Sequence, residues 1–280
     1  MGEAVPKGTD EGYNSTSFHK LSSMIIRNRE FKNYTYVMAI INLTPDSFYK
    51  DSRCDEYSVL KAVERAIKEG ASVIDIGAQS TRPGYSEVSA DCEISRFERP
   101  LKSIKQNFDI PVSVDTYFSK SADAALCLGA DMINDIWGLT HDKDMAEVIA
   151  KHNASVCIMH NAKEVLSGDI WKPIESFLET SVNLALNEGI ERDKIILDGG
   201  IGFAKTREQN FELLNGYEKL NELGYPLLLG ASRKSMFGGK VEDRLEQTLQ
   251  STRLAAEKGV LFVRVHDVKQ NIEAIKQFYK

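Results

Sequence analysis

Eight short runs of apolar residues recur along this chain, and a stretch with helical spacing follows each of them. Most of these runs are rich in Val, Ile and Leu and carry almost no polar residue until their last positions. Near-continuous apolarity over so few residues is typical of strands that are buried on both faces, as in a parallel sheet. The runs are YVMAIIN (36–42), ASVIDIGA (71–78), IPVSVDT (110–116), DMINDI (131–136), ASVCIMH (154–160), KIILDGG (194–200), PLLLGAS (226–232) and LFVRVHD (261–267).

The stretches between the runs have the periodicity of amphipathic helices. In 57–70, for example, Val59, Val63 and Ala66 share one face, and Gly70 is a helix-ending residue. The remaining stretches are 93–106, 119–129, 144–152, 175–189, 210–224, 244–259 and 268–279. Eight strands alternating with eight helices in 280 residues predict an α/β fold, a single (β/α)₈ TIM barrel. A doubly wound open sheet is the alternative.

Composition and the N-terminal segment narrow the class of protein. Residues 1–24 are polar and predict a disordered tail, so residues 25–280 form the predicted domain. The N-terminus lacks the apolar segment of a secretory signal, and no run reaches the ~18 apolar residues that span a membrane. The net charge of -6 and pI near 5.5 argue against a nucleic-acid-binding protein.

Four cysteines are widely spaced, at Cys54, Cys92, Cys127 and Cys157. None forms a C-x-x-C pair, so the spacing predicts neither a zinc site nor a disulfide framework. Four reduced thiols in a cytoplasmic protein are the simplest interpretation.

Polar residues end the apolar runs, and in a barrel of this type the active site forms at the carboxyl ends of the strands. Each one could instead cap the following helix, and this alternative is strongest for Asp75 and Asp135. As a set, Asp115, Asn134 and Asp198 come from different strands and would converge on one mouth. The polar residues at strand ends are Asn42, Asp75, Asp115, Asn134, Asp135, His160, Asp198, Ser232, Arg233, Lys234, Arg264, His266 and Asp267.

The chemistry of this set divides into two halves. Carboxylates and amides can pair with the N–H and C=O groups of a flat heterocycle, and Lys234 would interact with the carbonyl side of that ring. Asn42, Arg264 and His266 on the rim suit an anionic phosphate, with Mg²⁺ sharing the oxygens. Asp46, in the loop after the first run, is either a metal ligand or a turn residue.

The stretch DGGIGFAKT (198–206) resembles a phosphate-binding loop, G-x-x-x-x-G-K-[ST], except that Ala204 stands where the second glycine belongs. Two other interpretations are open. The glycines could let the backbone approach a ligand beside Asp198, or they could only shape a turn. The mismatch at Ala204 disfavours the nucleotide loop.

Seven motifs in sequence, namely INLTPDSF, DIGAQSTRPG, SVDT, NDI, DGGIGFAKT, GASRKS and RVHDV, resemble those of the dihydropteroate synthases over residues 25–280. The resemblance implies a cytoplasmic, homodimeric (β/α)₈ transferase of folate biosynthesis. Such an enzyme joins 6-hydroxymethyl-7,8-dihydropterin pyrophosphate to 4-aminobenzoate, uses Mg²⁺, and is a sulfonamide target.

Carried over position by position, the resemblance also implies residue roles. Asp115, Asn134, Asp198 and Lys234 would bind the pterin, and Asn42, Arg264 and His266 the pyrophosphate, with Asn42 at the metal. Asp115, Lys234, Arg264 and His266 would be catalytic. The residues implied for the 4-aminobenzoate pocket are Phe48, Thr81, Arg82, Pro83, Phe203 and Ser235.

Two positions depart from the family pattern. The family usually has proline at position 199 and glycine at 204, where this chain has Gly199 and Ala204. We expect a looser loop with the chemistry retained. Two alternatives remain open: a pterin-dependent methyltransferase acting on methyltetrahydrofolate, and a relative that binds pterin without turnover.

Overall fold

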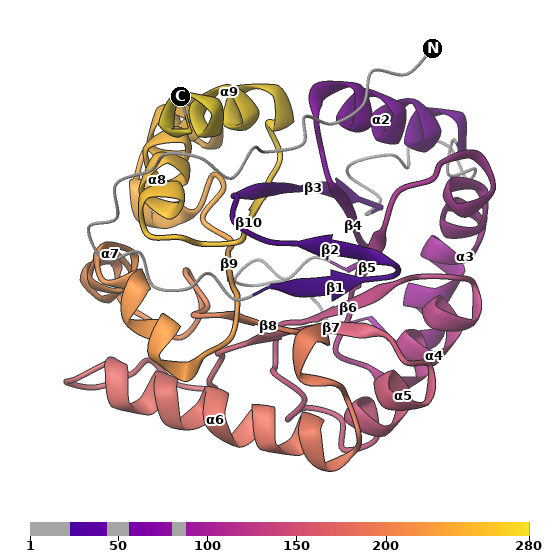
Figure 1. Cartoon of the computed structure of the whole chain (residues 1–280), viewed down its shortest axis with the longest axis horizontal. Helices are drawn as coiled ribbons and strands as arrows, with labels where there is room; N and C mark the ends of the chain where they lie inside the picture. Colours follow the sequence, from indigo (N-terminus) through magenta and orange to yellow (C-terminus); the bar gives the residue numbers. More distant parts are fainter. Residues whose placement is uncertain (1–22, 44–55, 80–87, 280) are drawn as a thin grey trace.

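Eight parallel strands form a closed barrel in the computed structural model, which describes residues 23–43, 56–79 and 88–279 (Figure 1). The first and last strands of the barrel pair in register, for example Val263 with Val37. This closure confirms the predicted (β/α)₈ barrel and makes the open sheet wrong. The strands are β3 (Tyr36–Asn42), β4 (Val73–Gly77), β5 (Val112–Asp115), β6 (Met132–Asp135), β7 (Ser155–Met159), β8 (Ile195–Asp198), β9 (Leu227–Leu229) and β10 (Phe262–Val265).

Helices surround the barrel, one after each strand (Figure 1). None of the helices in the described part of the chain is long and apolar enough to cross a membrane. The α-helices are α2 (Glu56–Glu69), α3 (Ala90–Asn107), α4 (Ser119–Cys127), α5 (Met145–Lys151), α6 (Trp171–Asn187), α7 (Arg207–Asn215), α8 (Leu245–Glu257) and α9 (Val268–Phe278). Short 3₁₀ helices are η1 (Arg192–Lys194), η2 (Tyr217–Leu223), η3 (Ser235–Phe237) and η4 (Val241–Arg244).

One predicted helix, 210–224, is divided in the structure. The α-helical part ends at Asn215, and a 3₁₀ segment begins at Tyr217. Gly216 separates them and packs against Trp171, whose ring would lie 2.7 Å from a Cβ at that position. Periodicity could not reveal this contact, because Trp171 is 45 positions away in sequence.

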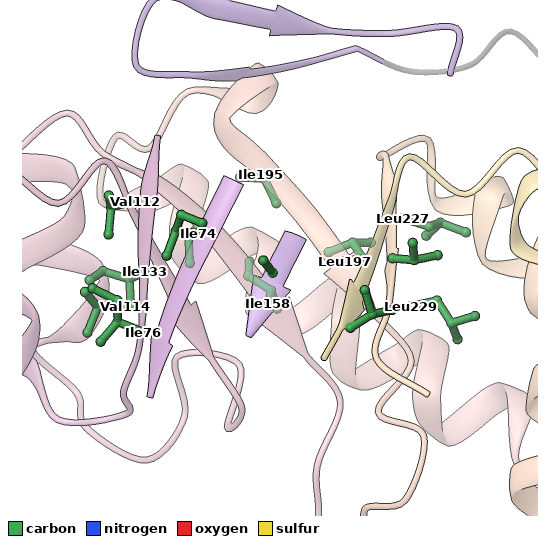
Figure 2. Close-up of a cluster of buried hydrophobic side chains, with 14 of the residues drawn as sticks. Ile74, Ile76, Val112, Val114, Ile133, Ile158, Ile195, Leu197, Leu227 and Leu229 are labelled. Carbon is green, nitrogen blue, oxygen red and sulfur yellow. The ribbon is translucent and has the colours of Figure 1, made fainter. Parts of the chain in front are cut away.

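Alternate side chains of each strand point outward and form the main core with the helices. Figure 2 shows Ile74, Ile76, Val112 and Val114 among them, all fully buried. A fully buried side chain of this size contributes about 1.5–3 kcal/mol through its removal from water. The helices are therefore held on the barrel by a continuous apolar layer.

The other set of alternate side chains points into the barrel and changes character along the strands. Near the strand starts it is apolar, with Met38, Met132, Ile196, Leu228 and Phe262 in one cluster. Toward the strand ends the inward positions become polar, as the change from Met132 to Asn134 in β6 illustrates. One end of the barrel is thus closed by apolar packing, and the other carries the polar groups.

A hairpin that the sequence analysis does not predict covers the apolar end. Its strands are β1 (Met24–Ile26) and β2 (Arg29–Phe31), which cross the middle of the ring of strands in Figure 1. Met24 lies in the predicted tail, yet its side chain is fully buried against the inner cluster. The ordered chain therefore starts no later than β1, and the rest of the predicted tail, 1–22, lies outside the described residues.

Polar contacts also attach this hairpin to the barrel. The Ser155 hydroxyl donates to the Ile25 carbonyl at 2.7 Å. Arg27 and Arg29 both bond the carboxylate of Asp109, which is largely exposed. Since exposed ion pairs contribute little, apolar burial provides most of the attachment.

We predict that Phe31→Ala lowers the free energy of unfolding by about 3–5 kcal/mol, because the cavity opens in packed surroundings. The Phe31 ring is 5% exposed and lies 5.0 Å from the rings of Tyr36 and Phe262. Urea unfolding measures the change. Tyr57→Ala, at a ring that is 63% exposed, is the control and should stay within about 0.5 kcal/mol of wild type. Equal midpoints for the two variants would contradict the assigned role of the hairpin.

Candidate active site

Strand register places a row of inward-facing residues at one level of the barrel mouth. Asn42 pairs with Gly77, Gly77 with Asp115, and Asp115 with Asn134. Gly77 has no side chain and so leaves space in this row beside Asn42. A Cβ at position 77 would lie 3.4 Å from the amide oxygen of Asn42. Three of the predicted ligand-binding residues are therefore at one level of the barrel, with Asp115 and Asn134 adjacent and Gly77 of β4 between Asn42 and Asp115.

A buried cation between two carboxylates lies at the centre of the mouth. Arg264 on β10 donates from Nε to Asp75 Oδ2 and from Nη2 to Asp115 Oδ2, each at 2.6 Å. The side chain of Asp75 is fully buried, and that of Asp115 is 9% exposed. Among the described residues, Asp75 Oδ1 has no hydrogen-bond partner. The contact with Arg264 is therefore the interaction that stabilises this buried carboxylate. We call Asp75, Asp115 and Arg264 the mouth triad.

The mouth triad shifts the proton affinities of its members. Burial raises the pKa of Asp115 to about 7; Arg264 opposes this rise, and the charges of Asp75 and Glu93 add to it. Burial alone would lower the pKa of Arg264, but attraction to the two aspartates raises it above the ordinary arginine value. Arg264 therefore stays charged, and Asp115 is a carboxyl whose ionisation responds to what binds beside it.

Asp198 is held rigidly at the end of β8. Its Oδ1 accepts from the Gly200 N–H at 2.7 Å and lies 3.0 Å from the Tyr217 hydroxyl. Tyr217 is fully buried and also donates to the Leu228 carbonyl on β9 at 2.6 Å. The other carboxylate oxygen, Asp198 Oδ2, faces Gly230, and a Cβ at position 230 would lie 3.4 Å from it. Burial raises the pKa of Asp198, while the Gly200 N–H and the Tyr217 hydroxyl lower it.

Lys234 follows β9 and reaches the same region. Its ammonium lies 4.2 Å from the centre of the Phe203 ring, a cation–π contact. Burial lowers the pKa of Lys234 to about 8; Arg264 adds to this shift, and Asp198 and Asp115 oppose it. Lys234 is therefore close enough to Arg264, Asp198 and Asp115 to feel their charges.

The glycine-rich stretch after Asp198 is not a phosphate-binding loop. The Lys205 ammonium lies 2.9 Å from His160 Nδ1 and 3.1 Å from the carbonyls of Gly200 and Phe203. Its donors therefore bind the loop itself. Thr206 caps α7 through a capping box with Gln209 rather than facing a metal. The nucleotide interpretation is wrong, because the lysine is committed to structure.

Burial and neighbouring charge fix the protonation of this pair. Burial lowers the pKa of Lys205 to about 7, Asp198 raises it, and Lys234 lowers it further. Burial, with the charge of Lys205, lowers the pKa of His160 to about 3. His160 is therefore neutral near pH 7 and accepts at Nδ1. Its place at a strand end reflects a role in holding the loop.

The two departures from the family pattern have opposite local effects. The Gly199 N–H, which a proline would lack, donates to the Tyr217 hydroxyl at 2.9 Å. Ala204 has φ of 46°, in the left-handed region that glycine tolerates better. Gly202 N–H also donates to Asn210 at 2.5 Å. The loop is tethered at several points, which argues against the looser loop expected at Gly199.

His266 is exposed and follows directly after β10, the strand that carries Arg264. Ser232 Oγ accepts from the His266 N–H at 3.2 Å and lies 3.0 Å from the ring Nδ1. Arg233 and Asp267 beside them form a bidentate ion pair with two contacts of 2.8 Å. These pairs hold the β9 and β10 loops together, and the Ser232 hydroxyl lies against one nitrogen of the His266 ring.

The structure resolves the alternatives for the two doubtful strand-end carboxylates. Asp135 accepts from the backbone N–H groups of Trp137 and Leu139 at 2.7 and 2.8 Å, which is a turn-capping role. Asp75 has no such role and belongs to the mouth triad. Sequence reasoning listed Asp75 among the strand-end residues but gave it no role in binding, and it left Lys205 and Tyr217 out of the site. For Asp75 the available signal was an inward position on a strand beside other strand-end charges.

The remaining predicted residues divide by location. Phe203 lies under Lys234, and Ser235 begins η3 directly after it. Phe48, Thr81, Arg82, Pro83 and Asp46 lie outside the described residues. Two of the six residues predicted for the 4-aminobenzoate pocket are therefore described, and they follow β8 and β9.

The barrel mouth offers a side-chain oxygen as a ligand for a metal ion. Asn42 offers an amide oxygen at the open end of β3, beside the space left by Gly77. Mg²⁺ prefers oxygen ligands and retains waters and substrate phosphates, so one protein oxygen next to a phosphate site is compatible with it. Asn42 fits such an ion in its donor chemistry.

Comparison with known proteins identifies the family of this chain. The family model described as "Pterin binding enzyme" matches residues 38–266. A curated dihydropteroate synthase of Clostridium beijerinckii is 47% identical over 261 residues, covering 90% of this chain and 97% of the relative.

Two solved structures extend this similarity. A dihydropteroate synthase from Clostridium difficile in the presence of pteroic acid has a TM-score of 0.86 and 43% identity, covering 89% of this chain and 97% of the other. The Xanthomonas albilineans enzyme with 4-aminobenzoic acid has a TM-score of 0.87 and 30% identity, covering 92% and 97%.

We predict that Arg264→Met lowers the free energy of unfolding by about 3–5 kcal/mol, because two buried carboxylates lose their cation. Adding Asp75→Asn to that variant should restore part of the loss, since it removes the fully buried charge. Urea unfolding at pH 8 measures both. Arg253→Met, which breaks an exposed pair with Glu246, is the control and should cost less than about 1 kcal/mol. Equal stability of the two single variants would contradict the central role of the mouth triad.

Proposed function

The chain belongs to the family of pterin-binding enzymes, and we propose on that premise that it is a dihydropteroate synthase of folate biosynthesis. The reaction joins 6-hydroxymethyl-7,8-dihydropterin pyrophosphate to 4-aminobenzoate and releases pyrophosphate. The observation that carries this function is the mouth triad beside Asp198 and Lys234, in a relative of enzymes crystallised with pteroic acid and 4-aminobenzoic acid.

The pterin would bind among Asp115, Asn134, Asp198 and Lys234. Asp198 uses Oδ1 for its internal contacts, so Oδ2 is directed at the ligand and would accept paired N–H groups of the ring. Lys234 would donate to the carbonyl side of the ring, and the Asn134 amide can both donate and accept. Pairing with ring N–H groups favours the ionised form of Asp198, which burial otherwise disfavours.

The pyrophosphate would lie at the rim, against Asn42, Arg264 and His266. Two of the three Arg264 nitrogens bind Asp75 and Asp115, so Nη1 is the nitrogen directed to the leaving group. Asn42 would hold Mg²⁺, which when bound neutralises charge on the pyrophosphate oxygens. The Ser232 contact orients the His266 ring as a second donor to the same oxygens.

Charge determines the order of the chemical steps. The C–O bond to pyrophosphate breaks and its electron pair leaves with the phosphate, while the electron-rich pterin delocalises the positive charge left on its methylene carbon. The Asp115 carboxylate, held by Arg264, stabilises this cation. The nitrogen lone pair of 4-aminobenzoate then forms the C–N bond, and the amine loses its proton afterwards. A strong general base is therefore unnecessary.

The 4-aminobenzoate ring would lie at the side formed by Phe203 and Ser235. Phe48, Thr81, Arg82 and Pro83 would complete the pocket from the two loops outside the described residues. Sulfonamides are aniline analogues of 4-aminobenzoate, so we expect them to compete for this pocket. We also propose that the chain is a homodimer that works in the cytoplasm, as the resemblance to the dihydropteroate synthases implies.

We predict that the purified chain forms dihydropteroate and pyrophosphate in equal amounts from the pterin pyrophosphate and 4-aminobenzoate. The assay follows both products together. Omitting 4-aminobenzoate should remove dihydropteroate, and EDTA should suppress both products if Mg²⁺ acts at Asn42. Asn42→Ala should raise the Mg²⁺ concentration required, because the ion then loses its protein oxygen.

Absence of both products, with tight pterin binding retained, would contradict the synthase function and leave the non-catalytic relative. Methyl transfer from methyltetrahydrofolate to a corrinoid under the same conditions would establish the methyltransferase instead.

A further inference from the structure

Three potential metal ligands meet on the outer surface of the barrel, although the cysteine spacing predicts no zinc site. Asp123 and Cys127 lie four residues apart on α4, on one helix face, and His152 follows the end of α5. Helices α4 and α5 are packed neighbours. The carboxylate oxygen, the thiol sulfur and the imidazole nitrogen all lie within 4.8 Å of one another. We call these residues the α4–α5 cluster.

The α4–α5 cluster is at the opposite end of the barrel from the mouth. Each helix runs back from the carboxyl end of its strand, so its own C-terminus lies near the strand starts. Cys127 is the last residue of α4, and His152 is the C-cap of α5. The cluster is therefore separate from the residues proposed to bind pterin and Mg²⁺.

Two of the side chains face the same atom of the third. Asp123 Oδ1 lies 2.8 Å from His152 Nε2, and Cys127 Sγ lies 4.0 Å from the same nitrogen. A nucleophilic triad would use the two ring nitrogens for two different partners. Convergence of oxygen, sulfur and nitrogen on one point is instead the arrangement of metal ligands.

We propose that the α4–α5 cluster binds a divalent transition-metal ion of the zinc type through Asp123, Cys127 and His152. Thiolate, imidazole and carboxylate together suit Zn²⁺, whereas Mg²⁺ prefers oxygen alone. Three protein ligands leave the fourth tetrahedral position to water. The ion replaces the proton in the contact between Asp123 and His152 and the proton of the thiol. Cys127 is exposed, so the ion enters directly from solvent.

The groups around the α4–α5 cluster permit a metal ion to replace these protons. Lys151 Nζ lies 3.5 Å from Asp123 Oδ1, and its side chain is 68% exposed, so it can move away when the ion arrives. Asp144 and Glu147 line the pocket next to Asp123 together with Lys120 and Lys151, so side chains of both charges lie there. A bound ion would connect α4 to α5 and cover the Cys127 thiol.

The direct test is Co²⁺ titration of the full chain, first treated with a chelator and kept under a phosphine reductant without oxygen. We expect one Co²⁺ per chain with thiolate-to-metal absorption, displaced by Zn²⁺ and unaffected by excess Mg²⁺. Cys127→Ala should abolish this absorption, and His152→Ala should weaken binding at least about tenfold. Cys92→Ala, at a half-buried cysteine on α3, is the matched control and should bind as wild type does.

A second readout uses the unmodified chain. Zn²⁺ should slow alkylation of Cys127 but not of Cys92, and it should raise the midpoint of thermal unfolding in wild type but not in Cys127→Ala. Absence of thiolate-to-cobalt absorption, or equal binding by wild type and Cys127→Ala, would overturn the proposal. Synthase activity measured with Mg²⁺ should be the same in Cys127→Ala and wild type, so the two proposals fail independently.

Discussion

A single arginine between two buried carboxylates sets the arrangement of the barrel mouth. Arg264 is on β10, and its partners Asp75 and Asp115 are on β4 and β5. A carboxylate inside a protein is costly unless a charge and hydrogen bonds compensate it, so these three side chains depend on one another. Their contact joins the last strand of the barrel to the second and third. The position of Asp115, on which the proposed chemistry depends, follows from this contact.

The two ends of the barrel interior explain how a packed fold can contain such charges. At one end, Met24, Ile26 and Phe31 of the hairpin cover the apolar inner side chains and keep water out. At the other end, internal hydrogen bonds hold Asp198 and the glycine-rich loop, with Tyr217 and Lys205 as the main anchors. Rigid placement of polar groups before substrate arrives is what electrostatic stabilisation of a transition state requires. The anchors therefore contribute to function without touching substrate.

Regular periodicity made most of the fold predictable. The eight apolar runs contain the eight barrel strands, since burial on both faces leaves a strong sequence signal. The hairpin was missed because MII and REF are too short to show alternation.

The details of the site were less predictable from sequence. The partnership of Asp75 with Arg264 spans 189 positions, and an aspartate near the end of an apolar run can equally be the cap of the next helix. Lys205 was misleading in the opposite way, because its motif resembles a phosphate loop while its contacts are internal. The α4–α5 cluster likewise depends on the packing of two helices, which cysteine spacing cannot show.

The central claim is that Asp115, held by Arg264, stabilises positive charge as pyrophosphate leaves. The most direct measurement is the single-turnover rate of pyrophosphate release by Asp115→Asn, together with its equilibrium affinity for the pterin pyrophosphate. Asp135→Asn, on the next strand with only backbone partners, is the control. The account predicts a rate lower by at least about a hundredfold in Asp115→Asn, with pterin affinity changed far less. A release rate near that of wild type in the folded variant would contradict it.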